Sequence, residues 1–394
     1  MIIKLARRTQ KIKPSPTLAI TARANALKAA GEDVIGLGAG EPDFDTPQVA
    51  KQAAIDAINA GMTKYTAVAG TIELRQAISD KFKRENQLDY ELDQILVSVG
   101  AKHSIYNLCQ ALLDEGDEVI IPAPYWVSYP DMVQLAEGTP VIIHTEIEQN
   151  FKITPNELKG ALNDKTRLLI LNSPSNPTGS VYNAAELRAL GDVLIDFPKI
   201  VILSDDIYEH IYWANESFCN IANVCPELSE RCVIINGVSK AYAMTGWRIG
   251  YAAGPIELIS AMKTIQSQST SNPTSIAQAA ATAALNSPAQ DLKHMVDAFK
   301  ERHDYVVAML NSINGIRCIA SHGAFYAFPH IQGLIDAVDD VNNDVELAEY
   351  LLSKLGIALV PGSAFGAPGY MRLSFATDLS TLKDALTRLA KRFN

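Results

Sequence analysis

Short apolar runs typical of β-strands alternate with helix-like segments along this chain up to about Gln290. The runs have the length and the Val and Ile content of buried strands. Because strands that alternate with helices pair in parallel through crossover connections, the pattern predicts an α/β fold around a mostly parallel, seven-stranded sheet. The runs assigned to this sheet are residues 95–99, 118–121, 141–144, 168–171, 200–203, 233–235 and 249–252.

Helix signals and a change of texture near Gln290 predict two domains. Thr46 can cap a helix that has Pro47 in its first turn and Gly61 at its end. The 394-residue length exceeds one typical core. We predict a large domain over 48–290 and a smaller α/β domain made from 1–47 and 291–394. Further helices are expected at 72–84, 291–313 and 344–355, and shorter strands at 316–320, 324–328, 357–360 and 371–375.

Composition excludes several classes of partner. The chain has 34 basic and 44 acidic residues, a net charge of -10, whereas nucleic acids and anionic membranes select a basic surface. The five cysteines are odd in number and form no C-x-x-C pair, so we expect neither a disulfide framework nor a metal site. No signal-peptide core and no apolar run of the ~20 residues that span a membrane is visible. We therefore expect a cytoplasmic protein that binds small molecules.

The segment SKAYAMTGWRIGY, at 239–251, combines two groups that suit a covalent cofactor. Lys240 follows an apolar strand candidate and a bend at Gly237, so burial is expected to lower the pKa of its amine and make it nucleophilic. Arg248 carries a planar, permanently charged guanidinium that suits a phosphate. Pyridoxal 5′-phosphate (PLP) is an aldehyde with a phosphate, and it could bind both groups. For an isolated pair, a surface lysine and a structural arginine are the ordinary alternative.

Further candidates stand at the carboxyl ends of predicted strands, where open α/β sheets place their ligands. A helix that starts at Gly100, Ala101 and Lys102 could bind a phosphate with its free amides, although every strand-to-helix turn has such a start. Asp205, in SDDIYEH, could keep a pyridine nitrogen protonated. It could equally cap a helix, and the neighbouring Asp206 leaves the register open.

Three more side chains could surround the same ring. Tyr208 and Asn176, the latter in NSPSNPTG, could donate to a ring oxygen, with an Asn-Pro turn as the alternative for the asparagine. Trp126, in PAPYW, offers a face for stacking and would equally suit a core. The glycines of GLGAGEPDFDTP, at 36–47, suggest a dinucleotide site, but acids and prolines follow where a helix N-terminus should begin. We expect these glycines to let the backbone approach a ligand.

Six segments, in order along essentially the whole chain, resemble those of one enzyme family. They are GEPDFDTP, KYTAVAG, NSPSNPTG, SDDIYEH, SKAYAMTGWRIGY and MRLSFATD. Together they resemble the fold-type I, class I aminotransferases, and most closely the bacterial aspartate aminotransferases of subgroup Ib. The resemblance implies a fold-type I PLP transferase whose large domain binds the cofactor, with amino acids and 2-oxo acids as substrates.

The resemblance implies a role for each candidate residue. Lys240 would be the Schiff-base lysine and would carry the proton of the 1,3-shift, and Asp205 would pair with the pyridine nitrogen. Arg372, in MRLSFATD, and the backbone of Gly38 would hold the substrate α-carboxylate. Further contacts would be Tyr208 and Asn176 at the ring oxygen, Trp126 on the ring face, and Arg248 with Gly100, Ala101 and Lys102 at the phosphate; Trp126 and Asn176 would also touch substrate.

Several positions bear on assembly and specificity. Tyr65, in KYT, resembles a tyrosine that reaches the phosphate of the neighbouring subunit's cofactor, which implies a homodimer. Gly237 departs from the many relatives that carry a phosphate-binding hydroxyl there, and residues 267–275 contain no arginine for the substrate's distal carboxylate. Lys102 and, second, Lys13 are the candidates for that carboxylate. A lysine fixes a carboxylate less strictly than an arginine, so specificity is expected to be looser.

The implied reaction is a ping-pong transfer of the amino group from L-aspartate to 2-oxoglutarate, giving oxaloacetate and L-glutamate. An aminotransferase for aromatic amino acids or prephenate is the alternative, because Lys13 and Lys102 could serve a different second carboxylate. A PLP-sensing regulator is a third interpretation. It is disfavoured because the sequence shows no added helix-turn-helix segment and contains every residue that catalysis needs.

Overall fold

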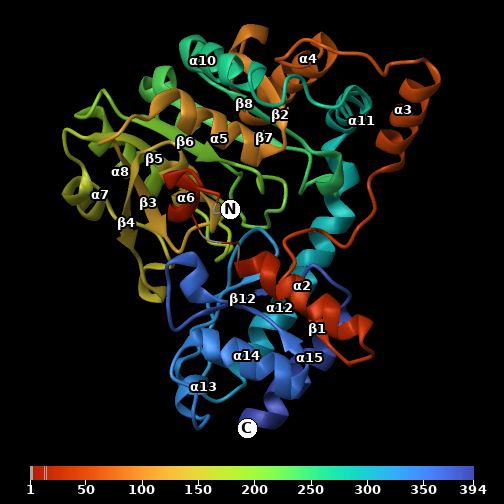
Figure 1. Cartoon of the computed structure of the whole chain (residues 1–394), viewed down its shortest axis with the longest axis vertical. Coiled ribbons are helices and arrows are strands. Elements are labelled where there is room, and N and C mark those ends of the chain that lie inside the picture. The colour runs from red at the N-terminus through yellow and green to blue at the C-terminus, as the bar shows by residue number, and fades with distance from the viewer. Residues whose placement is uncertain (1–2, 13, 15) are drawn as a thin grey trace.

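The computed structural model describes residues 3–12, 14 and 16–394, and Figure 1 shows a broad upper body built on a sheet above a smaller lower body. The sheet has seven strands in the spatial order β2-β8-β7-β6-β5-β3-β4. Neighbours pair in parallel except at β8, which runs antiparallel to β2 and β7. The predicted α/β fold is therefore confirmed. The strands are β2 (Ile95–Val99), β3 (Glu118–Ala123), β4 (Thr139–His144), β5 (Thr166–Asn172), β6 (Val201–Asp205), β7 (Cys232–Gly237) and β8 (Ile249–Ala253).

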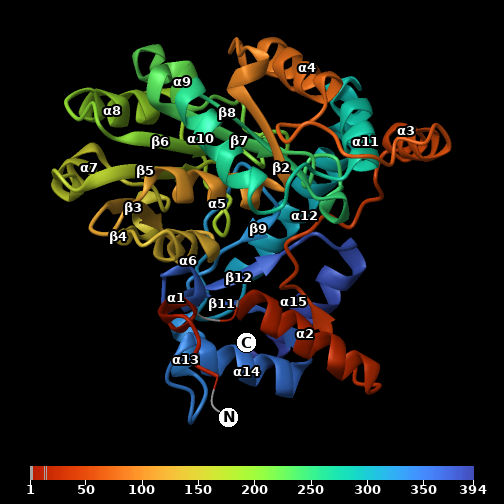
Figure 2. The same ribbon diagram turned by 45° about the horizontal axis from the view of Figure 1, so that its top comes forward.

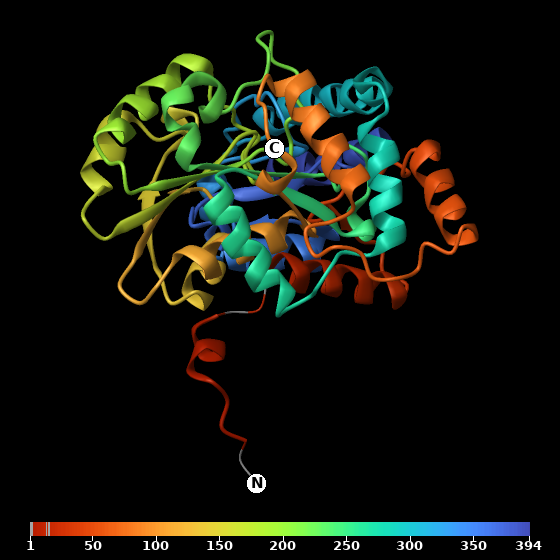
Figure 3. The ribbon, with the colours of Figure 1, turned by 90° about the horizontal axis from the view of Figure 1, so that it is seen from above.

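Helices cover both faces of this sheet, as Figure 3 shows from above. Alternate residues of a strand point to opposite faces, so Val97 packs with one helical layer and Leu96 with the other. Among the described residues, no helix is both long and apolar enough to cross a membrane. One layer contains α3 (Gln48–Asn59), α4 (Ile72–Lys81), α7 (Pro155–Ala161), α8 (Ala184–Ile195), α9 (Ile221–Val224) and α11 (Ser275–Leu285), and the other contains α5 (Ala101–Leu112), α6 (Ser128–Leu135) and α10 (Ile256–Ser267).

The smaller body joins the two ends of the chain (Figure 2). β1 (Ile35–Gly36) pairs in parallel with β10 (Ile357–Ala358), beside a three-stranded antiparallel sheet in the order β11-β12-β9. Its own core includes Phe299, Phe325 and Phe375. This separate core is compatible with the predicted domain division, whose boundaries near residues 47 and 290 stay a prediction. The remaining elements are α1 (Arg7–Lys11), α2 (Pro16–Ala29), α12 (Lys293–Asn311), α13 (Gln332–Asp336), α14 (Asp344–Leu355), α15 (Leu379–Phe393), β9 (Tyr326–Ala327), β11 (Val360–Pro361) and β12 (Met371–Ser374).

Two local predictions are wrong. Thr46 does not cap α3, whose N-cap is Pro47. The Thr46 hydroxyl instead donates to the carbonyl of Ala243 at 3.0 Å and accepts from Trp247 Nε1 at 3.0 Å, because a tertiary contact satisfies it better than the helix end does. Residues 316–320 do not form a strand and contribute only an isolated bridge between Arg317 and His330.

A close backbone contact places the start of α5 against the sheet. A Cβ atom on Gly250, in β8, would lie 2.0 Å from the amide nitrogen of Ala101. A Cβ on the paired Gly237 would lie 2.9 Å from the Gly250 Cα, so neither position has room for a side chain. This explains why residue 237 carries no hydroxyl: the space is taken by the neighbouring backbone.

We predict that Gly250→Ala lowers the free energy of unfolding by about 1–3 kcal/mol, because the added methyl group must push α5 away from β8. The matched control is Gly160→Ala in α7, where an added Cβ would meet no atom within 4 Å and should cause no loss. Urea unfolding of the two variants checks this. Equal effects would contradict the account of the contact.

Candidate active site

The carboxyl ends of the parallel strands border a cavity of about 440 Å³ that is also lined by residues of the smaller body. Gly100 is not on the wall but lies against Arg248, whose Nη2 would be 2.3 Å from a Cβ at that glycine. Tyr65 is 92% exposed and lies off the wall, and Lys13 is outside the described residues. The other predicted site residues all line the cavity: Gly38, Ala101, Lys102, Trp126, Asn176, Asp205, Tyr208, Lys240, Arg248 and Arg372.

Lys240 presents its amine to this cavity three residues after β7 ends. Its Nζ donates to the backbone carbonyl of Gly40, from the smaller body. Burial lowers the pKa of the amine to about 8, the positive charges of Arg372 and Arg248 act in the same direction, and the carboxylate of Glu41 acts against it. A larger share of this amine is therefore neutral near neutral pH than for an ordinary lysine, which suits a nucleophile.

Asp205 is the last residue of β6, and its carboxylate lines the cavity. Burial raises its pKa to about 6, while a hydrogen bond from Tyr129, whose hydroxyl donates to Oδ2 at 2.6 Å, limits the rise. Asp206 lies outside the cavity wall and accepts from the Ser204 hydroxyl at 2.6 Å and from Asn220 at 2.7 Å. The structure thus decides between the two aspartates. Asp205 faces the cavity, and Asp206 belongs to a buried hydrogen-bond network.

Arg372 lines the cavity and is suited to bind an anion. It is buried, it has no carboxylate partner among the described residues, and burial lowers its pKa. Nη1 donates to Asn176 Oδ1 at 2.9 Å and Nη2 donates to the Gly38 carbonyl at 2.7 Å, while Nε lacks a partner. A buried cation with a free donor is stabilised by an incoming anion, and a guanidinium suits a carboxylate. Asn176 and Gly38 hold the guanidinium ready for that ligand.

Another part of the cavity wall is suited to a phosphate. Arg248, in the left-handed backbone conformation at φ 56°, donates to the Thr245 carbonyl at 2.8 Å and lies beside Gly100 at the start of α5. The first amides of α5, at Ala101 and Lys102, have no partner within the helix and carry its positive dipole end. A guanidinium beside a helix N-terminus binds dianions well.

The side chain of Lys102 carries a second positive charge near the Arg248 guanidinium. Its Nζ lies 4.8 Å from the ring centroid of Trp126, and partial burial together with the charge of Arg248 lowers its pKa. The ammonium group therefore stands over the same aromatic wall that we expect to stack on a ligand ring. It is placed to meet a second anionic group of a bound molecule.

Three residues of the site were missed in the sequence. Tyr129, which donates to Asp205, stands three residues after Trp126, and an i, i+3 spacing at a helix start was an available signal. Glu41 lines the cavity and accepts from the Thr245 hydroxyl at 2.9 Å. In the sequence it is one of several acids in GEPDFDTP, and nothing in that segment assigns it a role. Tyr326 lies in an apolar strand that reads as ordinary core, so no sequence signal pointed to it.

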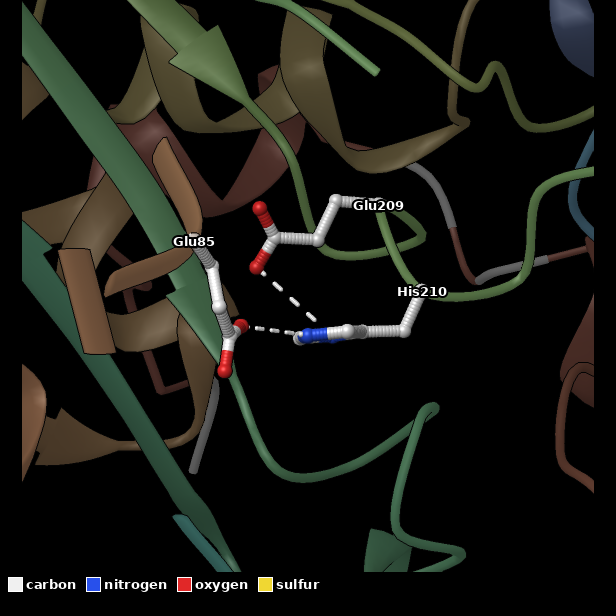
Figure 4. A group of neighbouring side chains, drawn as sticks. All are labelled: Glu85, Glu209 and His210. Carbon is white, nitrogen blue, oxygen red and sulfur yellow. Dashed lines mark hydrogen bonds and ion pairs between the residues drawn. The ribbon is translucent and has the colours of Figure 1, made fainter. Parts of the chain in front are cut away.

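A partly buried ion-pair cluster includes two residues of the turn that follows Asp205 (Figure 4). Glu85, Glu209 and His210 bring their ligand atoms within 4.8 Å of one another, a spacing that could hold a metal ion. However, the fully buried Lys81 donates to Glu209 and lies 3.9 Å from Glu85. Because an ammonium group already supplies the positive charge, the cluster is a structural ion-pair cluster.

This ion-pair cluster fixes the two segments that carry the reactive groups. Glu209 accepts from Asn236 of β7 at 2.7 Å, so it ties the strand that leads to Lys240 to the turn that follows Asp205. His210 Nε2 lies 2.7 Å from Glu85, and its ring packs edge-on against Tyr242 at 6.0 Å between centroids. The reactive amine and carboxylate therefore share one rigid support.

The set of groups defines the ligand that fits. Among the described residues, the site combines a buried amine, a carboxylate without a cation in hydrogen-bond contact, the start of a helix and a buried arginine with an unpaired Nε. These groups suit an aldehyde cofactor with a basic ring nitrogen and a phosphate, together with a carboxylate substrate. Fold and site together are those of an aminotransferase.

Comparison with known proteins identifies the family. Residues 32–389 match aminotransferase class I and II, and the chain belongs to this family, which is known for its dependence on PLP. It is 57% identical over 393 residues to an aspartate/prephenate aminotransferase of Nitrosomonas europaea, covering 98% of this chain and 99% of the relative. It is 50% identical to an aspartate aminotransferase of Bacillus subtilis, with 99% of each chain covered.

Solved structures agree with this family assignment. The crystal structure of the aspartate aminotransferase from Rhizobium meliloti superimposes with a TM-score of 0.95 at 50% identity, covering 99% of this chain and 98% of that one. The Thermus thermophilus aspartate aminotransferase with maleate gives a TM-score of 0.92 at 42% identity, covering 99% and 100%. The predicted fold-type I aminotransferase is therefore confirmed.

We predict that the Lys240 amine of the cofactor-free protein reacts with a small aldehyde with a pH midpoint near 8. Raising the pH removes the proton, so half of the amine is neutral at pH 8, whereas an amine of pKa 10.5 would be only about 0.3% neutral there. The measurement is the rate of imine formation against pH, with Lys240→Ala giving the contribution of the other lysines. A midpoint above 10 would contradict the lowered pKa.

Proposed function

We propose that this enzyme uses PLP to transfer the amino group of L-aspartate to 2-oxoglutarate by a ping-pong route. The observation that carries the proposal is that the Lys240 amine, with a pKa of about 8, shares one cavity with the Asp205 carboxylate and the guanidinium of Arg372. A nucleophilic amine, a partner for a ring nitrogen and a carboxylate receptor are the three groups that the reaction needs in one place.

The proposed cofactor contacts follow from the groups on the wall. PLP, when bound, supplies a protonated ring that stabilises negative charge at the substrate α-carbon. Asp205 would keep the ring nitrogen protonated, because a buried carboxylate favours a positive charge beside it. Asn176 uses its Oδ1 for Arg372 and so retains its NH₂ group for the ring oxygen. Tyr208 would donate to the same oxygen, Trp126 would cover the ring face, and Arg248 with the start of α5 at Gly100, Ala101 and Lys102 would bind the phosphate.

The proposed substrate contacts orient the Cα–H bond of the substrate. Arg372, beside Gly38, would bind the α-carboxylate and Lys102 the distal carboxylate, which leaves the Cα–H bond a defined direction. The neutral amine of Lys240, once released by the incoming amino group, would take the α-proton and return it on the cofactor side. A group with a pKa near 8 can both accept and release a proton near neutral pH.

The names of the relatives support aspartate as the donor and also keep a second candidate. The Bacillus subtilis relative is named for aspartate, whereas the Nitrosomonas europaea relative is named for aspartate and prephenate. A compact ammonium at Lys102 could serve the second carboxylate of either molecule. Lys13, the other lysine proposed for this role, lies outside the described residues. Prephenate transamination is therefore the second candidate function.

We predict that Lys102→Met lowers kcat/KM for L-aspartate about 10- to 100-fold and leaves kcat/KM for L-phenylalanine within about threefold. A charge-assisted hydrogen bond to the distal carboxylate is lost, whereas a donor without that carboxylate loses nothing, and the backbone amide stays in place. Kinetics with the two donors and with prephenate as acceptor measure this. Lys199→Met, at an exposed lysine off the cavity wall, is the control. An equal loss for both donors would contradict the assignment.

We further propose a homodimer in which Tyr65 of the partner subunit completes the phosphate end of the site. Tyr65 is 92% exposed, and Val49, Ile55 and Ile58 leave an exposed apolar face on α3. A surface hollow of about 430 Å³ is lined by Arg248 and its neighbours, where a residue from outside this chain could reach the phosphate end. Sedimentation equilibrium should give the mass of two chains, and a stable single chain would contradict the dimer.

A cytoplasmic location is proposed from the cysteines. Cys109, Cys225, Cys232 and Cys318 are buried and all five cysteines are free, which suits a reducing compartment. Cell fractionation should recover the enzyme with cytoplasmic markers, and recovery from the periplasm or the medium would contradict this.

A further inference from the structure

Tyr326 joins two parts of the site. It lies in β9, it is fully buried, and it lines the cavity. Its hydroxyl oxygen is 2.9 Å from that of Tyr208, and its ring centroid is 4.5 Å from the guanidinium carbon of Arg372. The pairing of β9 with β12, which sets Ser374 opposite Tyr326, fixes this placement.

The two phenols share a single hydrogen bond, and its direction matters. Burial raises the pKa of both Tyr208 and Tyr326, so both keep their protons at neutral pH. Among the described residues, Tyr208 is the only hydrogen-bond partner of the Tyr326 hydroxyl. If Tyr208 donated, the buried hydrogen of Tyr326 would have no acceptor. If Tyr326 donates, Tyr208 keeps its own hydrogen for an acceptor in the cavity. Both hydroxyl groups then have an acceptor once a ligand is bound.

The ring of Tyr326 contacts Arg372. Its face attracts the Arg372 cation without using any of the guanidinium N–H groups, and Phe365 does the same from 5.0 Å. Arg372 therefore keeps its unpaired Nε for a carboxylate while remaining fixed in place.

The neighbouring backbone leaves space for the Tyr326 hydroxyl. A Cβ on Gly40 would lie 3.1 Å from this oxygen, so a larger residue in the loop would press on it. The carbonyl of the same glycine accepts from Lys240. The hydroxyl thus sits among the groups that carry the chemistry and not in the general apolar core.

We propose that Tyr326 is a positioning residue: its hydroxyl donates to Tyr208 and so directs the Tyr208 O–H into the cavity, while its ring holds Arg372 for the substrate carboxylate. This inference rests on the proposed function, in which Tyr208 donates to the ring oxygen of PLP. A phenol that accepts a hydrogen bond also becomes a stronger donor, so losing the Tyr326 hydroxyl weakens the Tyr208 contact without touching it.

The test is Tyr326→Phe, which removes the hydroxyl and keeps the ring. In the PLP-loaded enzyme, we expect the pH midpoint of the visible absorbance to rise by about 0.3 to 1 unit, because a weaker donor stabilises the negative ring oxygen less. We expect kcat to fall about 3- to 10-fold. The KM for L-aspartate should stay within about twofold, since the ring over Arg372 remains.

Two companion variants separate the two contacts. Phe365→Leu removes the other ring beside Arg372 and should raise KM with the pH midpoint unchanged. Adding Tyr326→Phe to Tyr208→Phe should leave the midpoint at the value of Tyr208→Phe alone. An unchanged midpoint in Tyr326→Phe, or a further shift in the double variant, would overturn the inference. A wild-type protein with PLP but no titrating visible band would instead contradict the proposed function.

Discussion

The site depends on a buried guanidinium, that of Arg372, which has no carboxylate partner among the described residues. Removing a cation from water is costly, and folded chains normally offset that cost with an ion pair. In the part of the chain that the structure describes, Arg372 has only neutral acceptors, Asn176 and the Gly38 carbonyl, and two aromatic rings lie beside it. The protein therefore keeps an uncompensated buried positive charge at a fixed place, where an anion would be stabilised. We propose that a carboxylate substrate supplies this anion. The same positive charge helps to lower the pKa of the Lys240 amine.

Segments far apart in sequence have to meet for this arrangement to exist. The loop at 38–47 brings Gly38 to Arg372, Gly40 to Lys240 and Glu41 to Thr245. The pairing of β1 with β10 connects the segment just before this loop with the C-terminal part of the chain. On the other side, the ion-pair cluster around Glu209 fixes the turn after β6 and the strand before Lys240. The reactive groups are therefore positioned from both bodies of the molecule, and the cavity between them is preorganised for its ligand.

Much of this could be predicted because parallel strands end at one edge of a sheet. Asp205, Asn176 and Lys240 each follow an apolar run, so their convergence needed only the strand pattern. Contacts that depend on tertiary packing could not be predicted from the strand pattern. The Thr46 hydroxyl bonds the loop after Lys240 although its sequence position suits a helix cap. Tyr326 looks like a core residue because nothing local distinguishes a phenol that packs from one that donates.

The sequence also left choices that only the backbone geometry resolves. Asp205 and Asp206 are chemically equivalent in the sequence. The fold decides between them, because Asp205 ends β6 at the cavity whereas Asp206 accepts from Ser204 outside the cavity wall. The roles of all the predicted site residues stay predictions. Tyr65 does not line this cavity, and Lys13 lies outside the described residues.

The most direct measurement of the central claim is half of the reaction on its own. The PLP-loaded protein is mixed with excess L-aspartate in the absence of any oxo acid, and the visible absorbance of the bound cofactor is followed beside a Lys240→Ala sample. The account predicts rapid loss of the visible band with release of one equivalent of oxaloacetate in the wild-type protein and neither in the variant. A band that persists in the wild-type protein would contradict aspartate as the donor, and release of oxaloacetate at the wild-type rate by Lys240→Ala would contradict the role of the lysine.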